Sequence, residues 1–202
     1  MNASIALLRS GLVVLVLGVL AGCAGPVKNM REAPLEKTVA VKPEPGKAMV
    51  VFMRPSGLGY AVQSSVFEVK DNQALLVGIV AAKTKVAHQA TPGKHLFMAI
   101  GESADYMEAD LLPDRTYYVQ VSPRMGLWKA RFSLDPVSGA TVDSGVFKNE
   151  FAECGWVEKN EQSDAWAREN MPSVLEKHAK YFKDWQATPA ANRPTLVSQD
   201  GR

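Results

Sequence analysis

The most informative stretch of the sequence is residues 84–100, TKVAHQATPGKHLFMAI. Two runs of strand length, 84–90 and 94–100, flank the turn residues Thr91-Pro92-Gly93. Proline presets the backbone angle that the first half of a tight turn needs, and glycine accepts the positive φ of the second half. The stretch therefore predicts two antiparallel strands joined by a short loop.

The same pattern of short apolar or alternating runs continues on both sides of this hairpin. Further strands are expected at residues 48–54, 63–69, 74–80, 105–111, 115–122 and 126–134. A spacing of about ten residues with turn signals between runs is typical of a β-sandwich. We therefore predict a mainly β domain over residues 48–136, an antiparallel β-sandwich of seven to eight strands.

The C-terminal extension, residues 137–202, has a helical pattern instead. Ser163 can cap one helix over 164–168, and Pro172 suits the first turn of a second helix that runs to about Trp185. One apolar stripe follows the second helix: Val174, Leu175, His178, Tyr181, Phe182 and Trp185. The extension is therefore expected to contain one or two helices, with a single apolar face.

The N-terminus has the build of an export signal over residues 1–22. Arg9 is its only charge, and the apolar run at 11–20 is ten residues long. A membrane span needs about 20 apolar residues, so cleavage is the better interpretation. The run ends in Leu20-Ala21-Gly22-Cys23, which resembles the lipobox of bacterial lipoproteins.

That resemblance implies cleavage before Cys23 and lipidation of its thiol, with acyl chains such as palmitate holding the protein at a membrane. Residue 24 is Ala rather than Asp, which by the same resemblance favours the outer membrane, facing the periplasm. Residues 23–47 are rich in Pro, Lys and Glu and are expected to form a flexible tether. The alternative is an ordinary secretory signal with a chance cysteine.

Charge argues against nucleic acid as a partner. Without Arg9 the mature chain carries 22 basic and 21 acidic residues, and it has no run of Lys or Arg. Nucleic-acid binding depends on a concentrated basic surface, so we exclude it and expect the partners to be the membrane and an unknown envelope protein.

Two motifs carry a second resemblance. Residues 91–95, TPGKH, and 112–119, LPDRTYYV, resemble a family of small bacterial lipoproteins with PEGA-like domains, although Asp114 stands where glycine is common. The resemblance covers about residues 48–136. It implies a transthyretin-like or immunoglobulin-like sandwich with a binding or structural role and no catalytic residues.

No familiar catalytic or phosphate-binding motif occurs, and we predict no catalytic residue and no cofactor. His88 and His95 would share one sheet face of the hairpin, so they could hold a metal with a third ligand, or simply face solvent. The second interpretation is favoured, so no metal is predicted. The acidic residues Glu102, Asp105, Glu108 and Asp110 could pair their carboxylates or hold calcium, but a solvated strand face is favoured.

Several other side chains have a structural and a functional interpretation. If Cys23 is lipidated, Cys154 has no partner for a disulfide within the chain, and its apolar neighbours favour burial. His178 is expected to be an interior histidine with its hydrogen bonds satisfied. Tyr117, Val119, Val121, Trp128 and Phe132 could line a cleft for a lipid or glycan but are expected to form core.

These observations lead to two hypotheses about function. The first is a membrane-anchored, non-enzymatic interaction or scaffold module of the cell envelope. The alternative is a small-ligand binding protein, for a lipid or glycan, with a pocket between the sheet and the C-terminal helices. A hydrolytic enzyme would need an acid, a base and a nucleophile that the sequence does not bring together.

Overall fold

The structure, a computed structural model, describes residues 28–34, 42–71, 73–126 and 130–202. The predicted cleavage site, Cys23 and Trp128 lie outside these residues. The strands are β1 (Arg31–Glu32), β2 (Ala48–Arg54), β3 (Ser64–Lys70), β4 (Gln73–Val80), β5 (Thr84–Ala90), β6 (Gly93–Ile100), β7 (Ala104–Leu111), β8 (Thr116–Arg124), β9 (Arg131–Pro136), β10 (Gly155–Glu158) and β11 (Thr195–Leu196). The helices are α2 (Gly139–Val142), α3 (Gly145–Glu153) and α4 (Glu161–Ala187), with short 3-10 turns at Ala190–Asn192 and Ser198–Asp200.

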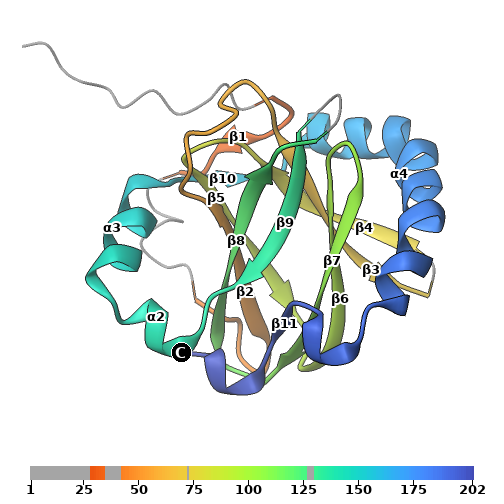
Figure 1. The fold of residues 1–202 in the computed structure, drawn as a ribbon. Coiled ribbons are helices and arrows are strands. Elements are labelled where there is room, and N and C mark those ends of the chain that lie inside the picture. Colours follow the sequence, from red (N-terminus) through yellow and green to blue (C-terminus); the bar gives the residue numbers. More distant parts are fainter. Residues whose placement is uncertain (1–27, 35–41, 72, 127–129) are drawn as a thin grey trace, which may run out of the picture.

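The strands form two sheets, ordered β1-β10-β5-β2-β8-β9 and β11-β7-β6-β3-β4 (Figure 1). The mainly β fold with a C-terminal helix is therefore confirmed. The prediction of seven to eight antiparallel strands is wrong, because the described residues contain eleven strands and both sheets are mixed. The parallel pairs are β2 with β8, β5 with β10 and β7 with β11.

The extra strands have a simple physical origin. β10 and β11 come from the C-terminal extension, and β10 is only four residues long. Such short segments carry no visible alternation, and they gain their stability by pairing with the edges of sheets that already exist. The extension is therefore part of both sheets rather than an appendage to a domain that ends at residue 136.

The hairpin expected at residues 84–100 is also different in the structure. β5 pairs with β2 in one sheet, whereas β6 pairs with β3 and β7 in the other. Thr91 and Pro92 carry the chain across from sheet to sheet. The turn residues fix the reversal of the chain, but the choice of partner follows from burial, because both strands contribute to the shared core.

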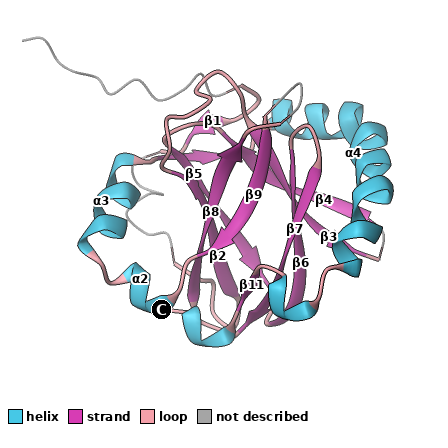
Figure 2. Ribbon diagram, viewed as in Figure 1, coloured by secondary structure: helices cyan, strands magenta, loops and turns pink. Residues whose placement is uncertain are grey.

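The main core lies between the two sheets. Phe52 of β2 and Phe97 of β6 meet there, with ring centroids 5.1 Å apart. Helices cover the outer faces: α3 packs Phe147 against Met53 of β2, and α4 packs on β4 and β7 (Figure 2). Strand β2 is consequently buried on both faces, which explains its unbroken apolar sequence.

The two helices expected at 164–168 and from Pro172 to about Trp185 are one continuous helix, α4, and the extension also contains α2 and α3, which were not predicted. Asn160 is the N-cap of α4 and Ser163 is its third residue, where the two side chains bond each other's backbone N–H groups. Pro172 lies inside the helix. Val174 is buried and Phe182 and Trp185 pack on the core, so most of the apolar stripe of α4 packs on the sandwich, whereas Leu175 is 38% exposed. None of the described helices is long and apolar enough to cross a membrane.

Parts of the expected tether pack on the domain. Met30 is buried in the main core, and β1 pairs antiparallel with β10. The carbonyl of Asn29 accepts a hydrogen bond from the Ser163 hydroxyl. The amide of Gln89 bonds the backbone of Lys42 and Glu44, at 2.8 and 3.0 Å. The packed domain therefore begins by Asn29, only six residues after Cys23.

Candidate functional site

A cavity of about 870 Å³ lies between the first half of α4, the loop at residues 55–63 and the adjoining ends of β8 and β9. Its apolar lining comes from both sheets and the helix: Leu58, Val62, Ile79, Ile100, Ala130, Phe132, Trp166 and Val174. Binding sites for small molecules are concave, largely apolar and of this size. The cavity therefore lies between the ends of the two sheets and the C-terminal helix α4.

The charged side chains at this cavity are mainly basic. Lys28, Arg124 and Lys177 line it, together with the single carboxylate Glu102. Arg131 neutralises Glu102, donating to the carboxylate from Nε and Nη2 at 3.1 and 3.0 Å. The ammonium of Lys177 donates to the carbonyl of Gly101 at the cavity wall. Arg124 is paired in the same way with Asp135, at 3.2 Å from Nη2 to Oδ1. The site is therefore an apolar floor whose rim carries two ion pairs and, in addition, the ammonium groups of Lys28 and Lys177.

Arg54 shapes the loop on one side of the cavity. The side chain is fully buried at the end of β2. Its guanidinium donates to the carbonyls of Leu58 (2.6 Å), Gly59 (2.8 Å) and Val62 (2.6 Å), and it lies 5.1 Å from the ring centroid of Phe132. Desolvation by burial lowers the Arg54 pKa from its ordinary value. The three hydrogen bonds from the guanidinium to these carbonyls hold the loop in the curved path that forms the rim of the cavity.

Sequence reasoning missed Arg54. The only local signal was a single charged residue at the end of an otherwise apolar strand, followed by the loop Pro55-Ser56-Gly57-Leu58-Gly59. A charge at the end of a buried strand must find hydrogen-bond acceptors nearby. A glycine-containing loop can provide them, because Gly59 adopts a φ of 64°, which lets the chain curl back over the guanidinium.

His88 and His95 do come together, although not as strand neighbours in one sheet. Glu68 of β3 bridges them: its Oε2 lies 2.8 Å from His88 Nε2 and its Oε1 lies 2.6 Å from His95 Nδ1. Both imidazole rings pack on Phe97, at centroid distances of 6.0 and 5.9 Å. The three side chains thus connect the two sheets at the edge of the core.

The hydrogen bonds fix the charge of this cluster. His95 Nε2 donates to the carbonyl of Thr91 at 2.7 Å, and Nδ1 faces the carboxylate of Glu68. Carbonyls and ionised carboxylates only accept, so both ring nitrogens of His95 carry hydrogen. The bond to Glu68 raises the pKa of His95, and the bonds from His88 and then His95 lower the pKa of Glu68 to about 2. The cluster is an ion pair of His95 and Glu68, with His88 as a further donor.

His88 and His95, the pair considered as metal ligands, form a hydrogen-bonded cluster with Glu68. Glu68 occupies the place of a third ligand, but it accepts hydrogen bonds from both rings. Among the described residues, no group of three or more His, Cys, Asp or Glu side chains is arranged to hold a metal ion. The geometry of the cluster matches a hydrogen-bonded ion pair.

The four acidic residues singled out in the sequence do not converge. Glu102 pairs with Arg131, and Glu108 pairs with Arg193 at 3.3 Å. Asp105 points to the opposite face of β7 from Glu108 and Asp110, since side chains alternate along a strand. Burial raises the pKa of Asp105. These carboxylates form no paired acid and base.

The remaining candidates are structural. Tyr117, Val119 and Val121 are fully buried, and Phe132 is core that also faces the cavity. His178 belongs to the buried face of α4, where its Nδ1 lies 3.0 Å from the hydroxyl of Tyr106 on β7, and burial lowers the pKa of His178. His178 is therefore the interior histidine that was expected.

Cys154 is buried beside Met53, Val137 and Phe147, as predicted. Burial raises the pKa of its thiol to about 11, so almost no thiolate exists at neutral pH. We expect the folded mature protein to react with a thiol reagent at least about a hundredfold more slowly than the urea-unfolded protein. Timed titration with a chromogenic disulfide measures both rates, and equal rates would show that Cys154 is accessible.

Comparison of the sequence with protein-family models and with curated proteins finds no match.

Proposed function

We propose that this protein is a lipid-anchored, non-enzymatic protein of the bacterial cell envelope that binds a small anionic amphiphile in the cavity beneath α4. The observation that carries the proposal is the cavity itself, with its apolar floor and basic rim. An acyl or other hydrocarbon portion matches the floor, where it would leave water. A carboxylate or phosphate matches the rim, which includes Lys28, Arg124 and Lys177.

This proposal favours the ligand-binding hypothesis over the interaction module. A scaffold that used the apolar stripe of α4 would need that stripe to be exposed. Val174, Phe182 and Trp185 instead pack on the sandwich. Between the two ligand classes considered from the sequence, the lining suits a lipid better than a glycan, because its exposed surface is mainly apolar.

The anchor belongs to the same proposal. Its support is the lipobox-like Leu20-Ala21-Gly22-Cys23, and Ala24 favours the periplasmic face of the outer membrane. The PEGA-like, transthyretin-like or immunoglobulin-like kinship of the domain is also proposed here, supported by the two sheets that share one core. Mass spectrometry of the mature N-terminus tests the anchor: we expect an acylated Cys23, and an unmodified N-terminus elsewhere would contradict it.

The ligand is tested with the chain from Ala24 onward, which needs no detergent. We expect it to bind cis-parinaric acid, a fluorescent fatty acid, and dodecanoate to displace the probe about tenfold better than dodecanol, because only the acid meets the basic rim. Ser173→Trp, at an exposed position on α4 that lines the cavity, should weaken binding at least about tenfold by filling the space. Glu176→Trp, which is exposed on α4 outside the cavity lining, is the matched control. Equal binding by both variants would place the ligand elsewhere.

A further inference from the structure

Large apolar side chains are exposed around the mouth of the cavity. Leu58, Tyr60, Val62 and Met125 are 64%, 40%, 37% and 90% exposed. Leu58, Val62 and Met125 line the cavity. The loop at 55–63 and the end of β8, which are far apart in sequence, therefore meet at its mouth. The other large apolar side chains that the described residues expose lie on five separate segments: Leu75, Leu112, Val146, Leu175 and Val197. Apolar residues gathered on loop ends in this way are typical of a surface that contacts a partner.

Basic side chains accompany these apolar ones. Lys28 and Arg124 line the same cavity as Leu58 and Met125, so they lie at the same end of the molecule. Arg124 also pairs with the carboxylate of Asp135 at 3.2 Å, but its side chain stays 61% exposed. Apolar and aromatic side chains interspersed with Lys and Arg are the composition of surfaces that settle into the headgroup region of an anionic bilayer. Charge complementarity therefore points to a lipid surface as the partner.

The length of the chain before Lys28 brings this end close to the anchor. Four residues lie between Cys23 and Lys28. The five steps from one Cα to the next, at about 3.5 Å each when fully extended, reach no more than about 18 Å. Asn29 and Met30, which follow Lys28 directly, are fixed on the domain, since the carbonyl of Asn29 accepts a bond from Ser163 and Met30 is buried. A lipid on Cys23 therefore holds the Lys28 end near the membrane.

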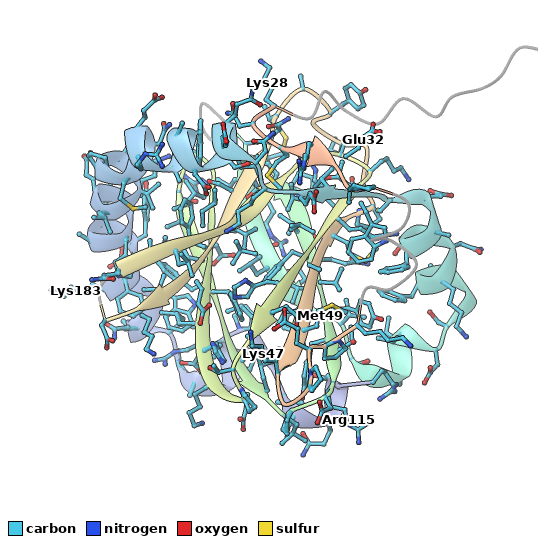
Figure 3. All side chains as sticks on the ribbon, turned by 180° about the vertical axis from the view of Figure 1, so that it is seen from behind. Lys28, Glu32, Lys47, Met49, Arg115 and Lys183 are labelled. Atoms are coloured by element: carbon cyan, nitrogen blue, oxygen red, sulfur yellow. The ribbon has the colours of Figure 1, made fainter. Side chains whose placement is uncertain are left out.

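The opposite end of the sandwich lies farther from that anchor. Lys28 and Glu32 project at one end of the molecule, and Lys47 and Arg115 at the other (Figure 3). The loop between β2 and β3, which carries Leu58 and Val62, lies at the β1 end, and the C-terminus lies at the opposite end (Figure 1). The cavity mouth, the apolar loop ends and the start of the packed chain share one end.

We propose that this end of the domain rests on the membrane, with Leu58, Tyr60, Val62 and Met125 in the headgroup region and Lys28 and Arg124 on anionic headgroups. The cavity mouth then faces the bilayer, so an amphiphilic ligand enters from the lipid side. The inference rests on the anchor in the proposed function, but the membrane contact itself does not require that the cavity binds a ligand.

The test uses the full-length lipoprotein reconstituted into vesicles of phosphatidylcholine and phosphatidylglycerol. Met125→Cys and, as the matched control, Val146→Cys on α3 each carry an environment-sensitive nitrobenzoxadiazole label. The buried Cys154 should take up little label, and the unsubstituted protein provides that blank. We expect blue-shifted emission and at least about threefold weaker acrylamide quenching at position 125, and solvent-like values at 146. Omitting phosphatidylglycerol should reduce the protection.

Equal quenching at the two positions, or protection at 146 alone, would overturn the proposed orientation. Protection that is unchanged without phosphatidylglycerol would overturn the role given to Lys28 and Arg124. Flotation of the protein with vesicles reports the anchor separately, and fatty-acid binding is measured without vesicles. A failure of the orientation is therefore distinguishable from a failure of the proposed function.

Discussion

We expect the Arg54→Met protein to have a free energy of unfolding about 2–4 kcal/mol below that of the parent. The guanidinium makes three charge-assisted hydrogen bonds to the carbonyls of Leu58, Gly59 and Val62. Methionine fills much of the same space but donates to none of them. Part of this loss is offset, because methionine also removes a buried charge with an unsatisfied donor. Among the described residues, no partner accepts a hydrogen bond from Arg54 Nε.

The loss of these hydrogen bonds in Arg54→Met should make the loop at residues 55–63 more susceptible to cleavage. Without the guanidinium, residues 55–63 lose three of the bonds that hold the rim of the cavity, so limited proteolysis should cut there faster in Arg54→Met. Binding of cis-parinaric acid should weaken in the same variant. Arg54→Lys should be intermediate, because one ammonium group cannot reproduce the planar fork that reaches three carbonyls.

The control is a second arginine in an exposed ion pair. Arg31 bonds Glu158 at 2.6 Å from a largely exposed position. Arg31→Met should cost less than about 1 kcal/mol, because surface ion pairs contribute little. Urea unfolding measures both. If the two substitutions cost the same, Arg54 does not hold the loop in the way that its contacts indicate.

Local patterns in the sequence were enough to locate most of the strands. The expected strands at 48–54 and 84–90 coincide with β2 and β5, because Pro55 ends the first and Thr91-Pro92 ends the second. β9 is the exception, since it starts at Arg131 rather than at Gly126. Strand length and turn chemistry are properties of a few neighbouring residues, so they can be predicted without the fold.

The pairing of strands could not be predicted in the same way. β2 lies parallel to β8 although five strands intervene in sequence, and the short β10 joins the sheet beside β5. Such choices depend on how two sheets share one core, which involves contacts distant in the sequence. The same limit hid which residues form the walls of the cavity, since they come from β3, β8, α4 and the loop at 55–63.

For the histidine cluster, one part of the arrangement could be predicted from the sequence and another part could not. His88 and His95 flank one turn, so their proximity was predictable from the sequence. Glu68 lies twenty residues before His88, on a strand of the other sheet. No periodicity connects it to the turn, and only the packing of the two sheets brings its carboxylate between the rings. The acceptor therefore remained undetected, and with it the charge state of the site.

This cluster should make stability depend on pH in a defined way. The pKa of His95 is raised in the folded state, so its contribution is complete below the unfolded value of about 6.5 and is lost as pH rises through the folded pKa. The pKa of Glu68 is lowered from 4.5 to about 2, so its contribution is complete above about 4.5 and is lost as pH falls toward 2. Both contributions are complete only between about pH 4.5 and 6.5.

Glu68→Gln tests the ion pair with little change of shape. Glutamine can still accept one hydrogen bond, but it carries no charge to hold His95 protonated. We expect it to lower the free energy of unfolding by about 2 kcal/mol near pH 5.5, and by less above pH 8 and near pH 2. Urea unfolding over this pH range, compared with the parent, gives the difference curve. That curve isolates the cluster because every other titrating group is common to both proteins.

Glu108→Gln is the matched control, because Glu108 is another partly exposed strand carboxylate and its partner is Arg193. Arginine stays protonated throughout the range, so this variant should cost less than about 1 kcal/mol and show no loss of effect as pH rises from 6 to 8. A Glu68→Gln difference that is equally flat over pH 6 to 8 would mean that His95 does not carry the charge. The two nitrogen contacts of His95 predict the opposite, since one ring faces a carbonyl and a carboxylate at once.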